Sequence, residues 1–243
     1  GNFKDLRARG ELPEASGEGS MSSTFGAAAR DIRVWALFVV YAACFGVELT
    51  INNIAAIYFF DNFDLTLATA GMIAGLFGLM NLFARTLGGV FSDLFARQSG
   101  LKGRVRWLFI ALLCEGVALV GFAQMETLAV AIGIMLVFSL FVQMAEGATF
   151  GIVPFVNRKA LGAVAGIVGA GGNAGAVAAG FLFRSEELTY QEGLMYLGMG
   201  VIVISLFALL VRFSAATEAE ESRAYDAAVA DRKQQSEQQP ASA

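Results

Sequence analysis

Residues 127–156 read TLAVAIGIMLVFSLFVQMAEGATFGIVPFV and contain one charged side chain, that of Glu146. A helix needs about 20 mostly apolar residues to cross a hydrocarbon core about 30 Å thick. This stretch is longer than that, and few polar residues interrupt it. It therefore predicts a helix that spans a membrane.

Five further apolar segments accompany this one along the chain. They cover residues 34–60, 67–96, 107–124, 162–183 and 193–212. Apolar residues make up 56% of the chain and charged residues 16%, whereas soluble domains are typically about 25% charged. The mean hydropathy of +0.62 agrees with that difference. The sequence therefore predicts an all-α integral membrane protein with a bundle of six transmembrane helices, and it excludes a soluble globular domain.

Polar segments flank the apolar region at both ends. We predict a cytoplasmic linker over residues 1–33, the six-helix bundle over residues 34–212, and a polar cytoplasmic tail over residues 213–243. The chain opens at Gly1 without an initiating Met or a signal peptide, so we expect it to be a fragment of a longer protein.

Basic side chains gather on every second loop. They are Arg30 and Arg33, then Arg97, Lys102, Arg104 and Arg106, then Arg158 and Lys159, and finally Arg212. The loops between these positions are acidic or neutral apart from Arg184. Because Lys and Arg favour the cytoplasmic side, the sequence predicts a multi-pass protein of the cytoplasmic membrane with both termini in the cytoplasm.

The composition also excludes several kinds of chemistry. The chain contains no histidine and carries a net charge of −4. Imidazole metal sites and Ser-His triads are therefore excluded, and no nucleophile–base pair stands out. No extended basic patch indicates nucleic acid. The sequence predicts a protein that is not an enzyme, holds no metal or cofactor, and lies in a lipid bilayer.

Charged residues inside the apolar segments are the first candidates for function, because each costs about 2.5 to 3.5 kcal/mol near the bilayer centre. Arg85 lies about 15 Å from the cytoplasmic end of its segment, and Glu146 lies at a similar depth. Glu48 lies inside the first segment. Asn81 shares a helix face with Arg85, and a cation beside an amide suits an anion site. Alternatively, Arg85 pairs permanently with Glu146 and holds two helices together.

The segment 162–183 is rich in glycine around Asn173. Its glycines are Gly162, Gly166, Gly169, Gly171, Gly172, Gly175 and Gly180. Glycine costs about 1 kcal/mol relative to alanine inside a helix, so stability does not explain this density. Close helix packing is one interpretation, and packing combined with lining of a substrate path is the other. Tyr41 and Phe45 share a face of the first segment, a pattern that by itself usually reflects packing.

Several of these stretches resemble the nitrate/nitrite porters of the major facilitator superfamily, in particular their high-affinity branch. They are FGVELTINN at residues 45–53, GLMNLFARTLGGVFSD at 78–93 and AEGATFGIVPFVNRKALGAVAGIVGAGGNAG at 145–175. The opening GNFKDLRARGEL resembles the central loop that joins the two halves of such a porter. The resemblance implies that the chain is the C-terminal half, and that the N-terminal six-helix half is missing.

The resemblance also implies roles for individual residues. Arg85 corresponds to one of two arginines that clamp nitrate, and the second lies in the missing half. Tyr41 and Phe45 resemble an aromatic pair that lines the anion cavity. Asp93 and Arg97 stand where the superfamily braces its cytoplasmic gate. The nitrate signature of the family corresponds to Gly169, Gly171, Gly172, Asn173 and Gly175.

The implied function is transport of nitrate or nitrite by alternating access, with proton-coupled nitrate uptake favoured. Glu48 and Glu146 are the candidates for proton coupling, while symport and nitrate–nitrite exchange both stay open. One alternative is a porter for another small anion on the same scaffold. The other is a non-transporting membrane assembly subunit in which Arg85 is permanently paired. The subunit and transporter readings differ in whether the glycines of segment 162–183 face the same cavity as Arg85.

Overall fold

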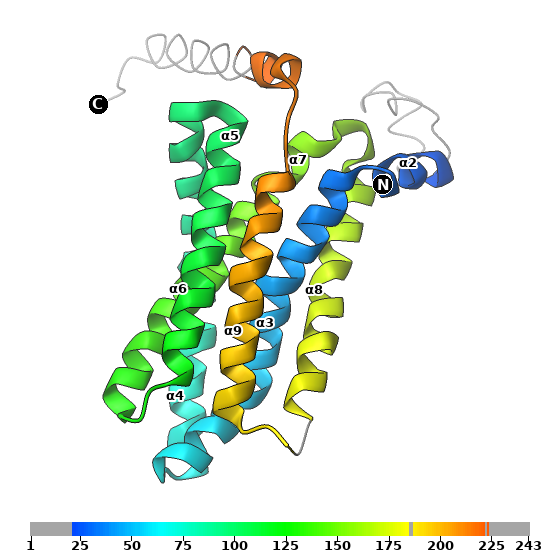
Figure 1. Cartoon of the computed structure of the whole chain (residues 1–243). Coiled ribbons are helices and arrows are strands. Elements are labelled where there is room, and N and C mark those ends of the chain that lie inside the picture. The colour runs from blue at the N-terminus through cyan, green and yellow to red at the C-terminus, as the bar shows by residue number, and fades with distance from the viewer. Residues whose placement is uncertain (1–20, 185–186, 222, 224–243) are drawn as a thin grey trace, which may run out of the picture.

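The computed structural model describes residues 21–184, 187–221 and 223, and the part of the chain it describes is helical without a strand. The expected linker before residue 21 and the tail after residue 223 lie outside the described residues. Figure 1 shows the long helices side by side, with their connections at the two ends of the bundle. The helices are α2 (Met21–Ala29), α3 (Ile32–Phe63), α4 (Leu67–Leu79), α5 (Asn81–Ala123), α6 (Leu128–Phe150), α7 (Val153–Val156), α8 (Leu161–Phe183) and α9 (Tyr190–Ser205).

Five stretches are long and apolar enough to cross a membrane. They are Ile32–Phe63, Leu67–Ala123, Leu128–Val156, Arg158–Phe183 and Tyr190–Leu210. All but one match a single segment expected from the sequence. The exception, Leu67–Ala123, contains two expected segments, 67–96 and 107–124. The chain is therefore an all-helical, multi-pass membrane protein.

Helix α5 reverses direction near its middle. Ser99 (φ −143°, ψ 17°) and Gly100 (φ 60°, ψ −143°) leave the helical conformation, and the positive φ of Gly100 is one that glycine adopts at little cost. Across the reversal, Arg104 forms an ion pair with Asp93 at 2.6 Å. The indole Nε1 of Trp107 donates to the Gly88 carbonyl at 3.1 Å. Residues 81–98 and 101–123 therefore lie side by side and antiparallel.

The expected segment 67–96 is interrupted at Met80, between α4 and α5. The hydroxyl of Ser139 on α6 donates to the Phe77 carbonyl at 2.8 Å. That carbonyl would otherwise accept the N–H of Asn81, so a side chain from another helix competes with the regular ladder. The start of α5, and with it Asn81, is thus set by a contact with α6.

The start of α3 is anchored by its own side chains. Asp31 is the N-cap, and Arg33 donates both to Asp31 and, at 3.0 Å, to the carbonyl of Val156 on α7. Partial burial raises the pKa of Asp31, but the hydrogen bonds and the charge of Arg33 outweigh it and hold the pKa below its ordinary value. Residues 21–29, part of the expected linker, form α2 beside this anchor.

Glycines allow the helices to approach closely at three crossings. An added Cβ on Gly88 would lie 2.7 Å from Cα of Met144, where α5 crosses α6. Gly116 and Gly198 bring α5 and α9 together in the same way. At the α3–α8 crossing, an added Cβ on Gly46 would lie 2.7 Å from the carbonyl carbon of Gly175. Small residues at such crossings are how membrane helices gain packing contacts.

Candidate functional site

Arg85 of α5 lies at the meeting point of three helices. Its Nη2 pairs with Glu146 of α6, lies 3.1 Å from Oε2 of Glu48 on α3, and lies 3.5 Å from Oε1 of Gln143 on α6. The three partners are buried, at 1%, 4% and 0% exposure respectively. The Arg85 side chain itself is 39% exposed. A half-exposed cation is therefore held at its tip by buried acceptors.

Three further predicted residues lie at this cluster. The amide of Asn81 donates to Oε1 of Glu48 at 3.0 Å, so Asn81 and Arg85 act on one carboxylate from one helix face. The ring centroid of Phe45 lies 6.0 Å from Cζ of Arg85, at the outer limit of a cation–π contact. Tyr41 stacks on Phe45 with ring centroids 5.2 Å apart. The expected aromatic pair thus lies beside the arginine.

Several polar atoms of the cluster lack a hydrogen-bond partner among the described residues. Nε of Arg85 and Nε2 of Gln143 are buried donors without an acceptor, and Oε1 of Glu146 is a buried acceptor without a donor. An unsatisfied buried polar atom costs about 1 to 3 kcal/mol. A small anion with several oxygens has the acceptors that these two donors lack.

The charge balance of the cluster limits when an anion can enter. With both carboxylates ionised, Glu48 and Glu146 outweigh Arg85, and the net charge is −1. Such a cluster repels an anion. Adding one proton brings the net charge to zero, and a further cation from outside this chain makes it positive. The charge of the cluster therefore decides whether it attracts or repels an anion.

The glycines of α8 divide between two faces. Gly171 and Gly175 pack against the backbone of α3 at Phe38 and Ala42, and Gly172 packs against the ring of Phe45. Gly172 therefore reaches the Arg85 cluster through Phe45. Gly169 would place an added Cβ in open space, and Asn173 is exposed. One face of the glycine-rich segment therefore packs against α3 beside the site. The other face is not covered by any residue that the structure describes.

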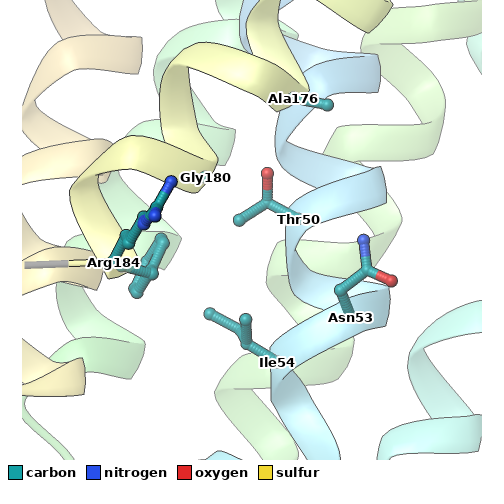
Figure 2. Close-up of a pocket in the computed structure, with 7 residues that line it drawn as sticks. Thr50, Asn53, Ile54, Ala176, Gly180 and Arg184 are labelled. Atoms are coloured by element: carbon teal, nitrogen blue, oxygen red, sulfur yellow. The ribbon is translucent and has the colours of Figure 1, made fainter.

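A pocket of about 350 Å³ lies between α3 and α8, toward the end of the bundle away from Arg158. Figure 2 shows Thr50 between the two helices, with Gly180 and Arg184 on the α8 side. The hydroxyl of Thr50 donates to the Gly46 carbonyl at 2.7 Å. The sequence did not predict this pocket. Its lining residues are Thr50, Asn53, Ile54, Ala176, Gly180, Phe183 and Arg184.

The two gate residues predicted from the resemblance lie near the reversal of α5. Asp93 is exposed and pairs with Arg104, as described for the fold. Arg97 is also exposed and forms no ion pair with another residue that the structure describes. The bracing role of this pair stays a prediction.

Sequence reasoning missed Gln143 and the pairing of Glu48 with Arg85. Gln143 lies one turn before Glu146 in an otherwise apolar helix, and this spacing of two polar residues was the available signal. A further buried acid, Glu115 of α5, is 0% exposed, and both of its carboxyl oxygens lack a partner among the residues with described positions.

No protein-family model matches the chain, but several curated transporters are similar to it. The chain is 47% identical over 185 residues to the high affinity nitrate transporter 2.5 of Arabidopsis thaliana, covering 76% of this chain and 37% of that protein. It is 37% identical over 215 residues to the high-affinity nitrate transporter 2.3 of Oryza sativa subsp. japonica, covering 88% and 41%. It is 40% identical over 148 residues to the nitrate/nitrite transporter NrtP of a Picosynechococcus strain, covering 58% and 26%.

These similarities confirm the resemblance inferred from the motifs. The relatives are named as transporters, in agreement with the expectation that the chain is not an enzyme. The chain spans about two fifths of the length of the curated relatives it matches first.

Proposed function

We propose that this chain, which belongs to the family of the high-affinity nitrate transporters, forms one six-helix half of a transporter that moves nitrate or nitrite across a membrane by alternating access. The observation that carries the proposal is the Arg85 cluster, a partly exposed cation held by buried carboxylates, whose buried Nε has no partner among the described residues. A charged group at that depth is costly and is retained where it serves a substrate.

The chain has six spans if the two arms of α5, residues 81–98 and 101–123, cross the membrane separately. In that case α4 and the first arm of α5 together form one span. The antiparallel contacts on either side of Gly100 support that count. The basic residues near the reversal and at Arg158 then lie on one side, which places both ends of the bundle in the cytoplasm. The fold is that of one half of a major facilitator superfamily transporter, in the cytoplasmic membrane.

Nitrate suits the cluster chemically. It is a planar monovalent anion, and a guanidinium is a planar fork of donors that can meet two oxygens at once. The free Nε of Arg85 and Nε2 of Gln143 are the donors it would engage. In this proposal Asn81 and Phe45 position Arg85, and the α8 residues from Gly169 to Gly175 line the path.

The exposure of Arg85 supports a second half outside this chain. A guanidinium 39% exposed on the side of a membrane-spanning bundle faces lipid unless something covers it. A second six-helix half that contributes another arginine would both cover the cluster and reverse its net charge. The transport path would then run between the halves.

Proton coupling follows from the same charge count. Protonating Glu48 or Glu146 removes the net negative charge that repels the anion, so proton and anion enter together.

The second candidate function is a membrane assembly subunit. It is supported by the pairing of Arg85 with both carboxylates, which would then be permanent. A porter for another small anion keeps the same cluster with a different substrate.

Uptake by purified protein in vesicles tests the proposal. The full-length protein that contains this chain should show saturable uptake of labelled nitrate, inhibited by nitrite and stimulated by an inward proton gradient. The chain alone should insert but show no saturable uptake. Failure of the full-length protein to transport nitrate or nitrite, with correct insertion, would favour the assembly subunit or another anion.

A further inference from the structure

We propose that the pocket between α3 and α8 is an outer capture site for a small monovalent anion, with Arg184 as its cation. The inference rests on the proposed transport function and adds a second binding site along the same path. Its lining residues lie on α3 between Thr50 and Ile54 and on the last turns of α8. Figure 1 shows α8 ending at the lower end of the bundle. That end faces outward in the proposed orientation.

Arg184 is available to bind a ligand. It is exposed and closes α8 as its C-cap, where its backbone N–H donates to the Phe181 carbonyl. Its guanidinium forms no hydrogen bond or ion pair with any other residue in the described part of the chain. Among the residues that the structure describes, nothing therefore competes with a ligand for the side-chain donors of Arg184 at the pocket that it lines.

The charges around the pocket make Arg184 distinctive. The other charged side chains that the structure describes at this end are acidic, namely Asp61, Asp64, Glu126, Glu187 and Glu192. Their field repels an incoming anion, and Arg184 gives one local region of opposite sign. An anion that approaches the bundle from this side is therefore attracted to the pocket.

The remaining lining offers space and a second donor. The amide of Asn53 donates one hydrogen to the Leu49 carbonyl at 2.8 Å, and its other hydrogen has no acceptor among the described residues. Opposite it, Gly180 would place an added Cβ in open space. The pocket volume of about 350 Å³ accommodates an anion with several waters, each occupying about 30 Å³.

The pocket connects to the Arg85 cluster along two helices. On α3, Asn53 follows Phe45 by eight residues, a rise of about 12 Å. On α8, Gly169, Asn173 and Gly180 lie at helical spacing on the uncovered face that ends at Arg184. On α8, Arg184 follows Gly172, which packs against Phe45, by 12 residues, a rise of about 18 Å. An anion held at Arg184 is thus about three helical turns from the aromatic pair beside Arg85.

Kinetics of the full-length transporter test the site. Arg184→Gln should raise the KM for nitrate about fivefold, the factor expected from losing one unit charge about 4 Å from the anion in water, and leave the maximal rate unchanged. Arg184→Lys should retain most of the affinity. Arg212→Gln removes the same charge at the opposite end of the bundle and should leave the KM unchanged. An unchanged KM in Arg184→Gln, or an equal rise in Arg212→Gln, would overturn the inference.

Chemical modification keeps the test independent of folding. In a full-length protein whose native cysteines, including Cys44 and Cys114, are replaced, Arg184→Cys is treated from outside with a cationic or an anionic thiol reagent. The cationic adduct should restore the low KM and the anionic adduct should raise it further, and nitrate should slow both reactions. Equal effects of the two reagents would overturn the capture site. A wild-type protein that transports no nitrate or nitrite would instead contradict the proposed function.

Discussion

Nη2 of Arg85 on α5 lies 3.1 Å from Oε2 of Glu48 on α3. The same nitrogen also pairs with Glu146 on α6, so one guanidinium is shared by two buried carboxylates from different helices. Its Nε remains without a partner among the described residues. Two carboxylates therefore face one guanidinium, which keeps one hydrogen-bond donor without a described partner.

Arg85→Lys keeps the charge and removes the planar fork. Losing one charge-assisted hydrogen bond, about 1.5 to 3 kcal/mol, predicts a 10- to 150-fold weaker apparent affinity for nitrate in the full-length transporter. Uptake and membrane abundance are measured together. If lysine gives normal affinity, or if Arg85→Gln combined with Glu146→Gln transports well, Arg85 belongs to the scaffold.

Neutralising the coupling carboxylate should remove the pH dependence of uptake. In the wild type, uptake should rise as external pH falls, because a proton cancels the excess negative charge of the cluster. Glu48→Gln and Glu146→Gln each fix one position as neutral, and the variant at the coupling position should take up nitrate at a rate insensitive to pH. Both variants retaining the wild-type pH profile would exclude these two residues as the proton site.

Gly175 and Gly166 provide a matched pair on one helix. Gly175→Ala adds a Cβ 2.7 Å from Cα of Ala42, and such overpacking should lower stability by about 1 to 3 kcal/mol. Gly166→Ala adds a Cβ in open space and should raise stability by up to about 1 kcal/mol, through helix propensity alone. Thermal unfolding of the two purified variants should shift in opposite directions. Equal shifts would contradict the close α3–α8 crossing.

Single cysteines test whether the two arms of α5 are separate spans. Lys102 is 67% exposed near the reversal, while Asp61 and Glu126 are exposed at the opposite end. An impermeant thiol reagent should label Asp61→Cys and Glu126→Cys from outside, and Lys102→Cys only after the membrane is opened. Labelling of all three from one side would rule out the six-span topology.

Glu115 should tolerate, and gain from, removal of its carboxyl. Both of its oxygens are buried without partners among the residues described, and each unsatisfied buried polar atom costs about 1 to 3 kcal/mol. Glu115→Met removes the unsatisfied group and should leave stability unchanged or higher. Glu115→Gln retains polar atoms and serves as the control. A large loss of stability in Glu115→Met alone would indicate a partner outside the described residues.

Much of the fold could be predicted because long apolar runs have few alternatives in a membrane. The expected segments 34–60 and 162–183 differ from α3 and α8 by only a few residues. The interruption at Met80 could not be predicted, because it depends on Ser139, which lies 62 positions from Phe77 in sequence. Periodicity describes one helix at a time and carries no information about a competing donor on another.

In the candidate site, too, the features of a single helix were predictable and the contacts between helices were not. Helical spacing correctly placed Asn81 and Arg85 on one face, since both contact Glu48. The division of the α8 glycines into a packed and an uncovered face was not predictable, because it depends on where α3 lies. Gln143 was missed because a single amide carries no charge to mark it.

The glycine contacts also determine which parts of the bundle can move. An added Cβ on Gly147 would meet the carbonyl group of Arg85, and Gly88 meets Met144, so α5 and α6 are in backbone contact on either side of the cluster. We expect these two helices to move as one body that carries both Arg85 and Glu146. Glu48 belongs to α3, whose backbone contact is with α8 through Gly46 and Gly175. If α3 and α8 shift relative to α5 and α6 during the proposed transport cycle, we expect Arg85 to stay with Glu146 while its 3.1 Å contact with Glu48 lengthens.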